Sequence, residues 1–85
     1  MNPDAPIESL RNLGPKSASW LRDAGITTIG ELRRLGPAVA FRLVRSRKAS
    51  ASLNLLWALE AGLKNKDWRE LTELTKEKLR REVQD

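Results

Sequence analysis

Apolar residues recur along this chain at the three- and four-residue spacing of amphipathic helices, in short segments separated by residues that end helices. Glycine, proline or polar clusters fall at positions 6, 14–15, 25, 36–37, 46–52 and 65–67. No run of β-branched residues alternates with polar ones for long enough to predict a strand. The pattern predicts an all-α domain over residues 7–85, a compact bundle of five to six short helices, with residues 1–6 as an N-terminal tail.

Six segments are expected to be helical: residues 7–13, 15–24, 29–35, 37–45, 51–64, and 68 to near the C-terminus. Segment 51–64 is apolar around much of its circumference, which is typical of a central helix around which others pack. Leu35 is expected to face inward, whereas Leu74 lies off the apolar stripe of the last segment and indicates a break near Thr72. The residues predicted to be largely buried are Leu21, Ile26, Leu32, Leu56 and Leu59.

Local signals support several of these boundaries. Pro15 suits the first position of a helix, where its missing amide costs nothing, and Gly25 suits a left-handed helix end. Thr28-Ile29-Gly30-Glu31 has the pattern of a capping box, and Asp67-Trp68-Arg69-Glu70 supplies a second cap. These signals predict helices that begin after positions 14, 28 and 67.

The amino-acid composition argues against catalysis. The chain has 85 residues, enough for one hydrophobic core, and contains no cysteine and no histidine. It therefore lacks thiolate nucleophiles, imidazole bases and the commonest zinc ligands. Its carboxylates, notably Glu31, Glu60 and Glu70, are each explained as cap partners or exposed charges rather than as an acid–base pair. We expect a protein that is not an enzyme and that holds no cofactor and no metal.

Positive charge is concentrated in the first part of the chain. The formal net charge is +5; residues 1–65 carry ten basic and five acidic side chains, and the remainder carries six of each. From Leu32 to Leu59 there are six basic residues and no acidic one. This imbalance predicts an anionic partner, with simple solvation of helix surfaces as the alternative. With no apolar run near the roughly 20 residues that span a bilayer and no signal-peptide pattern, we expect a soluble cytoplasmic protein without membrane contact.

One stretch carries a specific functional motif. Residues 10–18 read Leu-Arg-Asn-Leu-Gly-Pro-Lys-Ser-Ala and are followed by Trp20-Leu21 and Ala24-Gly25-Ile26. This sequence resembles the helix-hairpin-helix motif, which contacts nucleic acid, and predicts such a segment at about residues 7–35. In this motif a tight turn and the following helix N-terminus bring backbone amides to a phosphate. Asn12 replaces a glycine of the motif, and asparagine tolerates left-handed backbone. The alternative is a degenerate hairpin that serves only in packing.

The candidate nucleic-acid contacts come from this hairpin and from segment 37–48. They are Arg11, Asn12, Gly14, Lys16, Ser17, Arg42, Arg45 and Lys48. Arg42, Arg45 and Lys48 recur at three-residue spacing, which predicts a second phosphate-binding track; the alternative is that their aliphatic stems cover the core. Because such contacts go to phosphates, binding is expected to be largely independent of base sequence.

The three tryptophans each have two interpretations, burial in the core or stacking on an exposed base. Trp57 lies in the most apolar segment and Trp68 lies at a capped helix start. Burial is therefore expected for both. It is also favoured for Trp20, which flanks Leu21 in the hairpin's second helix.

Over a longer span, residues 10–68 resemble the C-terminal domain of the TfoX, or Sxy, family. Beyond the hairpin, the matching elements are Glu31-Leu32, Leu35-Gly36-Pro37, the stretch Ser-Leu-Asn-Leu-Leu-Trp-Ala-Leu-Glu at 52–60, and Asp67-Trp68. Phe41 stands where tyrosine is common, and Ala61-Gly62 reverses the usual order. The resemblance implies a role in natural competence, the uptake of DNA by bacteria, and in regulating transcription of the genes involved. Longer family members add an N-terminal domain, so we expect a free-standing version here.

DNA is thus the expected partner, contacted through phosphates by a regulatory module. A second hypothesis uses the same helical scaffold as a protein-interaction adaptor, which docks a transcription regulator or its own partner chain without touching DNA. Small helical folds serve both purposes, so the fold class does not choose between them. The oligomeric state stays open.

Overall fold

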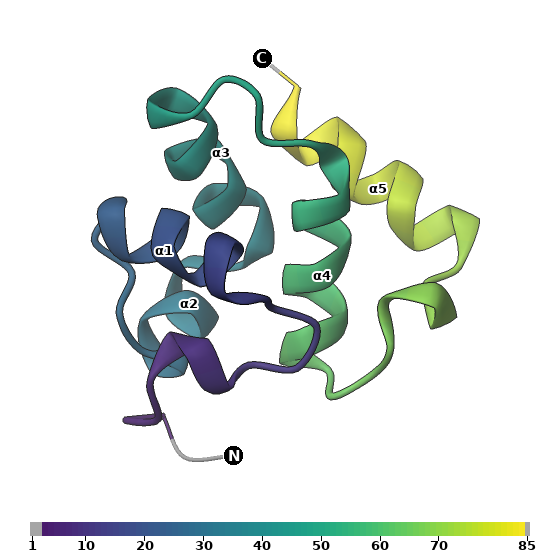
Figure 1. The fold of residues 1–85 in the computed structure, drawn as a ribbon. Helices are drawn as coiled ribbons and strands as arrows, with labels where there is room; N and C mark the ends of the chain where they lie inside the picture. Colours follow the sequence, from purple (N-terminus) through teal and green to yellow (C-terminus); the bar gives the residue numbers. More distant parts are fainter. Residues whose placement is uncertain (1–2, 85) are drawn as a thin grey trace.

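Five α-helices and two single-turn 3₁₀ helices make up the part of the chain that the structure, a computed structural model, describes, residues 3–84 (Figure 1). The α-helices are α1 (Pro15–Asp23), α2 (Ile29–Leu35), α3 (Pro37–Arg47), α4 (Leu53–Leu63) and α5 (Glu73–Val83). The 3₁₀ helices are η1 (Ile7–Ser9) and η2 (Trp68–Glu70). The predicted all-α class is confirmed. No helix in this part of the chain is long and apolar enough to cross a bilayer.

The helix boundaries follow the predicted local signals. Pro15 is the first residue of α1, and Gly25 just after that helix has a φ of 88°, a left-handed conformation that glycine adopts without strain. Before α2, Thr28 Oγ1 accepts from Glu31 N at 3.2 Å, and Glu31 Oε1 accepts from Thr28 N at 3.0 Å. This capping box satisfies amides that the first turn leaves unpaired. Hydrogen bonds from Thr27 and Thr28 also hold the pKa of the Glu31 carboxyl below its usual value.

The core is built from one face of every α-helix. Seven of the eleven residues of α4 are buried, and this helix lies between α1 and α5 (Figure 1). The five residues predicted to be buried are all at most 1% exposed: Leu21, Ile26, Leu32, Leu56 and Leu59. Trp57 is buried too, at 6%. The structure adds that α3 packs against α1, α2, α4 and α5, so α3 shares the central position with α4.

The first predicted helix, residues 7–13, is wrong beyond Ser9. Only η1 forms, and Leu10 then takes an extended backbone with φ −69° and ψ 132°. Ser9 Oγ donates to the Pro6 carbonyl at 2.7 Å, a local bond of the kind that competes with helix formation. The extended backbone at Leu10 lets this residue, 2% exposed, join the core.

The residues described before η1 do not form a detached tail. Ile29 N donates to Ala5 O at 3.0 Å, Gly30 N donates to Pro3 O at 2.8 Å, and Ile7 N donates to Thr27 O at 3.0 Å. Pro6 and Thr28 form an isolated antiparallel bridge. Residues 3–6 therefore lie along the start of α2. A local sequence pattern does not predict this contact, because it joins segments that are more than twenty residues apart.

The other boundary differences lie in the second half and at one exposed leucine. Helix α3 continues to Arg47, two residues beyond the prediction. The last predicted helix divides at Thr72, whose Oγ1 accepts from Thr75 N at 3.2 Å and caps α5. Leu74 is 81% exposed, as its place off the apolar stripe indicated, but Leu35, predicted to face inward, is 39% exposed. Helix α2 ends at Leu35, so this side chain lies at the end of the helix and is only partly covered.

The turn after η1 packs directly on α4. A Cβ atom at Gly62 would lie 2.6 Å from Arg11 O and 2.8 Å from Leu10 Cγ, distances that real carbon atoms essentially never show. Gly62 is therefore the position at which the hairpin backbone rests on the helix, and glycine is required because no side chain fits.

We expect Leu56→Ala to lower the free energy of unfolding by about 2–5 kcal/mol, because a fully buried leucine leaves a cavity in a close-packed core. Chemical denaturation measures this. Leu74→Ala, at an 81% exposed position, is the control and should leave the midpoint nearly unchanged. Equal midpoints for wild type and Leu56→Ala would contradict the core described above.

We expect Gly62→Ala to destabilise the fold by about 1–3 kcal/mol, because the new methyl group overlaps the hairpin backbone. This runs against the helix propensities, which favour alanine over glycine by about 1 kcal/mol. Thermal and denaturant unfolding of the variant measure the sign. A stabilised variant would show that the hairpin does not press on α4 in solution.

Candidate nucleic-acid interface

The turn of the predicted hairpin is carried by Asn12, between the short η1 and α1. This residue has a φ of 78°, the left-handed conformation that the motif's glycine would take and that asparagine tolerates. Gly14 is extended and precedes α1, and no side chain caps this helix. The first intrahelical bond is donated by Ala18 N to Gly14 O at 3.0 Å. The amides of Lys16 and Ser17 in the first turn are thus left without a partner inside the helix, as at any helix start.

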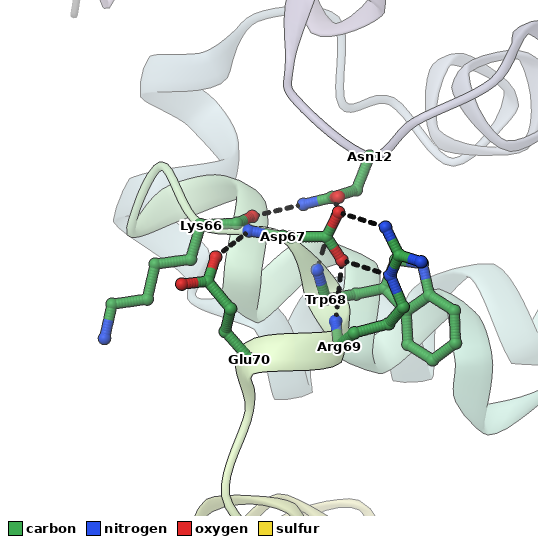
Figure 2. A network of polar contacts seen from close by, with 6 residues as sticks. All are labelled: Asn12, Lys66, Asp67, Trp68, Arg69 and Glu70. Atoms are coloured by element: carbon green, nitrogen blue, oxygen red, sulfur yellow. Dashed lines mark hydrogen bonds and ion pairs between the residues drawn. The ribbon is translucent and has the colours of Figure 1, made fainter.

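Arg11 and Asn12, two predicted phosphate contacts, are turned toward the loop that follows α4. Figure 2 shows the contacts of Asn12. Arg11 Nη1 donates to Asn65 O at 2.9 Å. Asn12 Nδ2 donates to Lys66 O at 2.7 Å, and its Oδ1 accepts from Trp68 N at 3.3 Å. Both side chains therefore hold the hairpin to the loop. This favours a packing role for these two residues.

The loop is itself braced by a cap around Asp67 (Figure 2). Asp67 Oδ1 accepts from Arg69 N at 2.9 Å and from Arg69 Nε at 3.0 Å, and Oδ2 accepts from Arg69 Nη2 at 3.1 Å. Glu70 Oε2 accepts from Asp67 N at 2.8 Å. The hydrogen bonds from the Arg69 side chain and backbone lower the pKa of Asp67 from 3.8 to about 2. The backbone around Trp68 is therefore fixed from both sides.

Two other predicted residues meet at a tryptophan. Lys16 Nζ lies 5.6 Å from the centroid of the Trp20 ring, and Lys48 Nζ lies 5.8 Å from it. Lys16 belongs to α1 and Lys48 follows α3, so the fold brings together cations that are far apart in the sequence. Both lysines are exposed, and the half-buried indole packs against the core. Attraction between an ammonium and an aromatic face holds each lysine near the ring.

A surface hollow beside this pair extends the positive charge. It is lined by Trp20, Asp23, Val44, Arg47 and Lys48. Arg47 was not among the predicted contacts, because the predicted track followed only the three-residue spacing of Arg42, Arg45 and Lys48. Asp23 places one carboxylate in the same hollow, so an anion is favoured on the side of Arg47 and the two lysines. We call Lys16, Trp20, Arg47 and Lys48 the cationic cluster.

The second predicted track, Arg42, Arg45 and Lys48, does not form one face. Arg45 Nη2 donates to Val83 O at 2.9 Å at the end of α5, and its guanidinium lies 5.3 Å from the Phe41 ring. Arg42 lies on the outward side of α3, where it lines a shallow hollow with Val39, Leu43 and Ser46. Spacing of three residues placed these side chains in a row, but the packing of α5 on α3 withdraws Arg45 from it.

Trp68 is exposed, at 41%, against the prediction of burial. The cap at Asp67 forms as expected, but it begins a single 3₁₀ turn at the surface rather than a long helix packed on the core. Trp68 and Trp20 both line a second hollow, with Asn12, Ser17, Ser52, Asn54, Leu55 and Ala58. Of the predicted site residues, Asn12 and Ser17 thus share a surface with two tryptophans. The sequence signal that could have pointed to Trp20 as a surface residue is its position four residues after Lys16, which puts both on one face of the helix.

The lowered pKa of Asp67 predicts how the stability of the fold depends on pH. The carboxyl should titrate near pH 2 instead of near its ordinary pKa of 3.8, because the folded state stabilises the carboxylate. The stabilisation that this group supplies is fully present above pH 3.8 and is lost as the pH falls through about 2. An NMR titration of the carboxyl carbon measures the midpoint, and Arg69→Ala should move it upward. A wild-type midpoint at 3.8 would mean that the bonds to Arg69 are absent in solution.

Comparison with known proteins places this geometry in a family. A model of the TfoX C-terminal domain matches residues 4–83. A search of curated proteins gives no match. Two solved structures from Listeria monocytogenes are similar to this chain, each with a TM-score of 0.84 and each covering 89% of it. One, an uncharacterized protein in a triclinic crystal form, is 32% identical and is covered over 86% of its length. The other, a protein of unknown function in a tetragonal form, is 30% identical and is covered over 94%. Because the family model spans nearly the whole sequence, the chain belongs to the TfoX C-terminal domain family.

Proposed function

We propose that this protein is a non-enzymatic, cytoplasmic regulatory module that associates with nucleic acid through its phosphates and acts in competence or in transcription regulation. The observation that carries the proposal is the convergence of Lys16 and Lys48 on Trp20, beside the uncapped start of α1. Membership of the TfoX C-terminal domain family supports the regulatory role.

The start of α1 supplies directional donors for a phosphate. Gly14 is exposed and has no side chain to block an approaching ligand, and a Cβ added there would have no atom within 4 Å. The amides of Lys16 and Ser17 point out of the helix start, and the helix dipole adds partial positive charge. Lys16 contributes a full charge from the same turn.

The other residues of the cationic cluster can contact further phosphates along a nucleic-acid backbone. Lys48 and Arg47 come from the end of α3, which has no acidic residue in its sequence. A nucleic-acid strand that contacts α1 can therefore continue across Trp20 to α3. Asp23 is the one carboxylate among the residues lining the hollow between Trp20 and Lys48. Such contacts read charge and spacing rather than bases, so binding is weakly dependent on sequence.

A specific surface favours the second candidate, an adaptor that docks a transcription regulator. Val39 and Leu43, four residues apart on the outward side of α3, are 44% and 39% exposed. With Arg42 and Ser46 they line one shallow hollow. An amphipathic helix with acidic flanks would match this apolar pair and its neighbouring arginine. This surface does not include Lys16 or Lys48.

We expect weak, salt-sensitive binding of the whole chain to DNA, with Kd in the range of about 10⁻⁴–10⁻⁶ M near physiological salt. Lys16→Glu and Lys48→Glu should each weaken binding and lower the slope of log K against log salt concentration by about one. Lys78→Glu is the matched control, because it makes the same charge change on α5, across α4 from α1 (Figure 1). Fluorescence anisotropy with labelled oligonucleotides at several salt concentrations measures all four proteins.

Melting temperatures show whether the variants stay folded, which is expected because exposed charge changes rarely cost much stability. Equal weakening by Lys16→Glu and Lys78→Glu would reduce the effect to net charge and contradict a localised site. If DNA does not bind at any salt concentration, and a Val39→Ser/Leu43→Ser variant loses capture of a transcription regulator, the adaptor is the correct function.

A further inference from the structure

We propose that the hollow between Trp20 and Trp68 binds an unpaired nucleobase, so that the preferred partner is single-stranded rather than duplex nucleic acid. This inference rests on the proposed function, because the cationic cluster beside Trp20 supplies the phosphate contacts. It adds to the phosphate site a base site that shares Trp20 with it and includes Trp68.

The first support is the way in which Trp68 is held. Its side chain is 41% exposed, although a tryptophan gains most by burial. Its backbone is nevertheless fixed, since Trp68 N donates to Asn12 Oδ1 at 3.3 Å within the turn capped by Asp67 and Glu70 (Figure 2). An exposed aromatic side chain on a fixed backbone can stack on a base without rearrangement of the chain that carries it.

The lining of the hollow matches the chemistry of a base. Its volume is about 360 Å³, within the range of small-molecule sites. Leu55 and Ala58, both buried, supply an apolar wall for a flat ring. Ser17, Ser52 and Asn54 supply hydroxyl and amide groups for its hydrogen-bonding edge, and Ser52 is not used to cap α4.

The two tryptophans have different parts in this site. Both Lys16 and Lys48 lie near the Trp20 ring, so a base would compete there with two cations. We therefore assign the stacking to Trp68, and Trp20 is the wall shared by the base site and the cationic cluster. One nucleotide can place its base against Trp68 while its phosphates lie near the lysines. In a duplex the base is paired and stacked and has to leave the helix first.

The experiment compares ligands that share phosphates and differ in bases. Anisotropy titrations use a 15-nucleotide oligo(dT), an abasic oligomer of the same length, and the oligo(dT)·oligo(dA) duplex. We expect oligo(dT) to bind about 5- to 150-fold more tightly than the abasic strand, the range given by stacking of one base. It should also bind more tightly than the duplex. An oligo(U) titration shows whether the unpaired bases come from DNA or RNA.

The decisive variant is Trp68→Leu, which keeps an apolar side chain but removes the aromatic face. It should bring oligo(dT) binding down to the abasic level without changing abasic binding. Trp68→Phe should restore part of the difference. Leu53→Ala, a loss of apolar surface at a 36% exposed position at the start of α4 and outside the lining of the hollow, is the control and should behave as wild type. The Phe variant also keeps the test valid if Trp68→Leu lowers stability.

The outcomes separate the two proposals. Equal, salt-sensitive binding of oligo(dT) and the abasic strand, unchanged by Trp68→Leu, would overturn the base site and leave the phosphate site intact. A preference for oligo(dT) that Trp68→Leu leaves unchanged would place the base elsewhere and overturn the assignment to this hollow. Absence of salt-sensitive binding to every oligonucleotide would overturn both proposals.

Discussion

The hairpin turn lies against α4 so closely that position 62 has no room for a side chain, and this contact fixes the relation between the two halves of the domain. It is reinforced by polar bonds, because Arg11 and Asn12 bind the carbonyl groups of Asn65 and Lys66 just beyond the same helix. With the hairpin so placed, Leu10 enters the core, α1 packs against α3, and Trp20 reaches Lys48. The arrangement of the candidate interface is thus a consequence of how closely one turn approaches one helix.

Much of the fold could be predicted because its helices end where local chemistry ends them. Gly25 and Thr28 act within three or four residues, so the sequence around them is sufficient to place the boundaries of α1 and α2. The burial of Leu56 and Leu59 followed from periodicity alone. The prediction was wrong at residues 10–13, where the backbone packs against α4, and at residues 3–6, where it is hydrogen-bonded to the start of α2. Those contacts join segments that a local window does not compare.

The candidate site could be predicted only in part, for the same reason. The left-handed backbone of Asn12 was foreseeable from its type, but the use of its amide to bridge Lys66 and Trp68 was not, because fifty-odd residues separate the partners. Arg45 looked like a surface cation until α5 placed a carbonyl group beside it. Trp68 was predicted to be buried because the cap at Asp67 and the apolar positions after it suggested one long helix. The chain forms a single 3₁₀ turn there instead. The roles of these side chains depended on distant neighbours, whereas the boundaries of α1 and α2 depended on adjacent residues.

The origin of the cationic cluster in two helices has an energetic consequence for the whole molecule. Lys16 and Lys48 are near one ring only when α1 and α3 are packed together, so an anion that bridges them binds the native state in preference to the unfolded one. By mass action, a ligand present at 100 times its Kd adds about 2.7 kcal/mol to the free energy of unfolding. For a domain of this size that is a large share of a typical total stability. A bound nucleic acid would then stabilise the packing of α1 on α3, and the free energy of unfolding would rise with the concentration of polyanion.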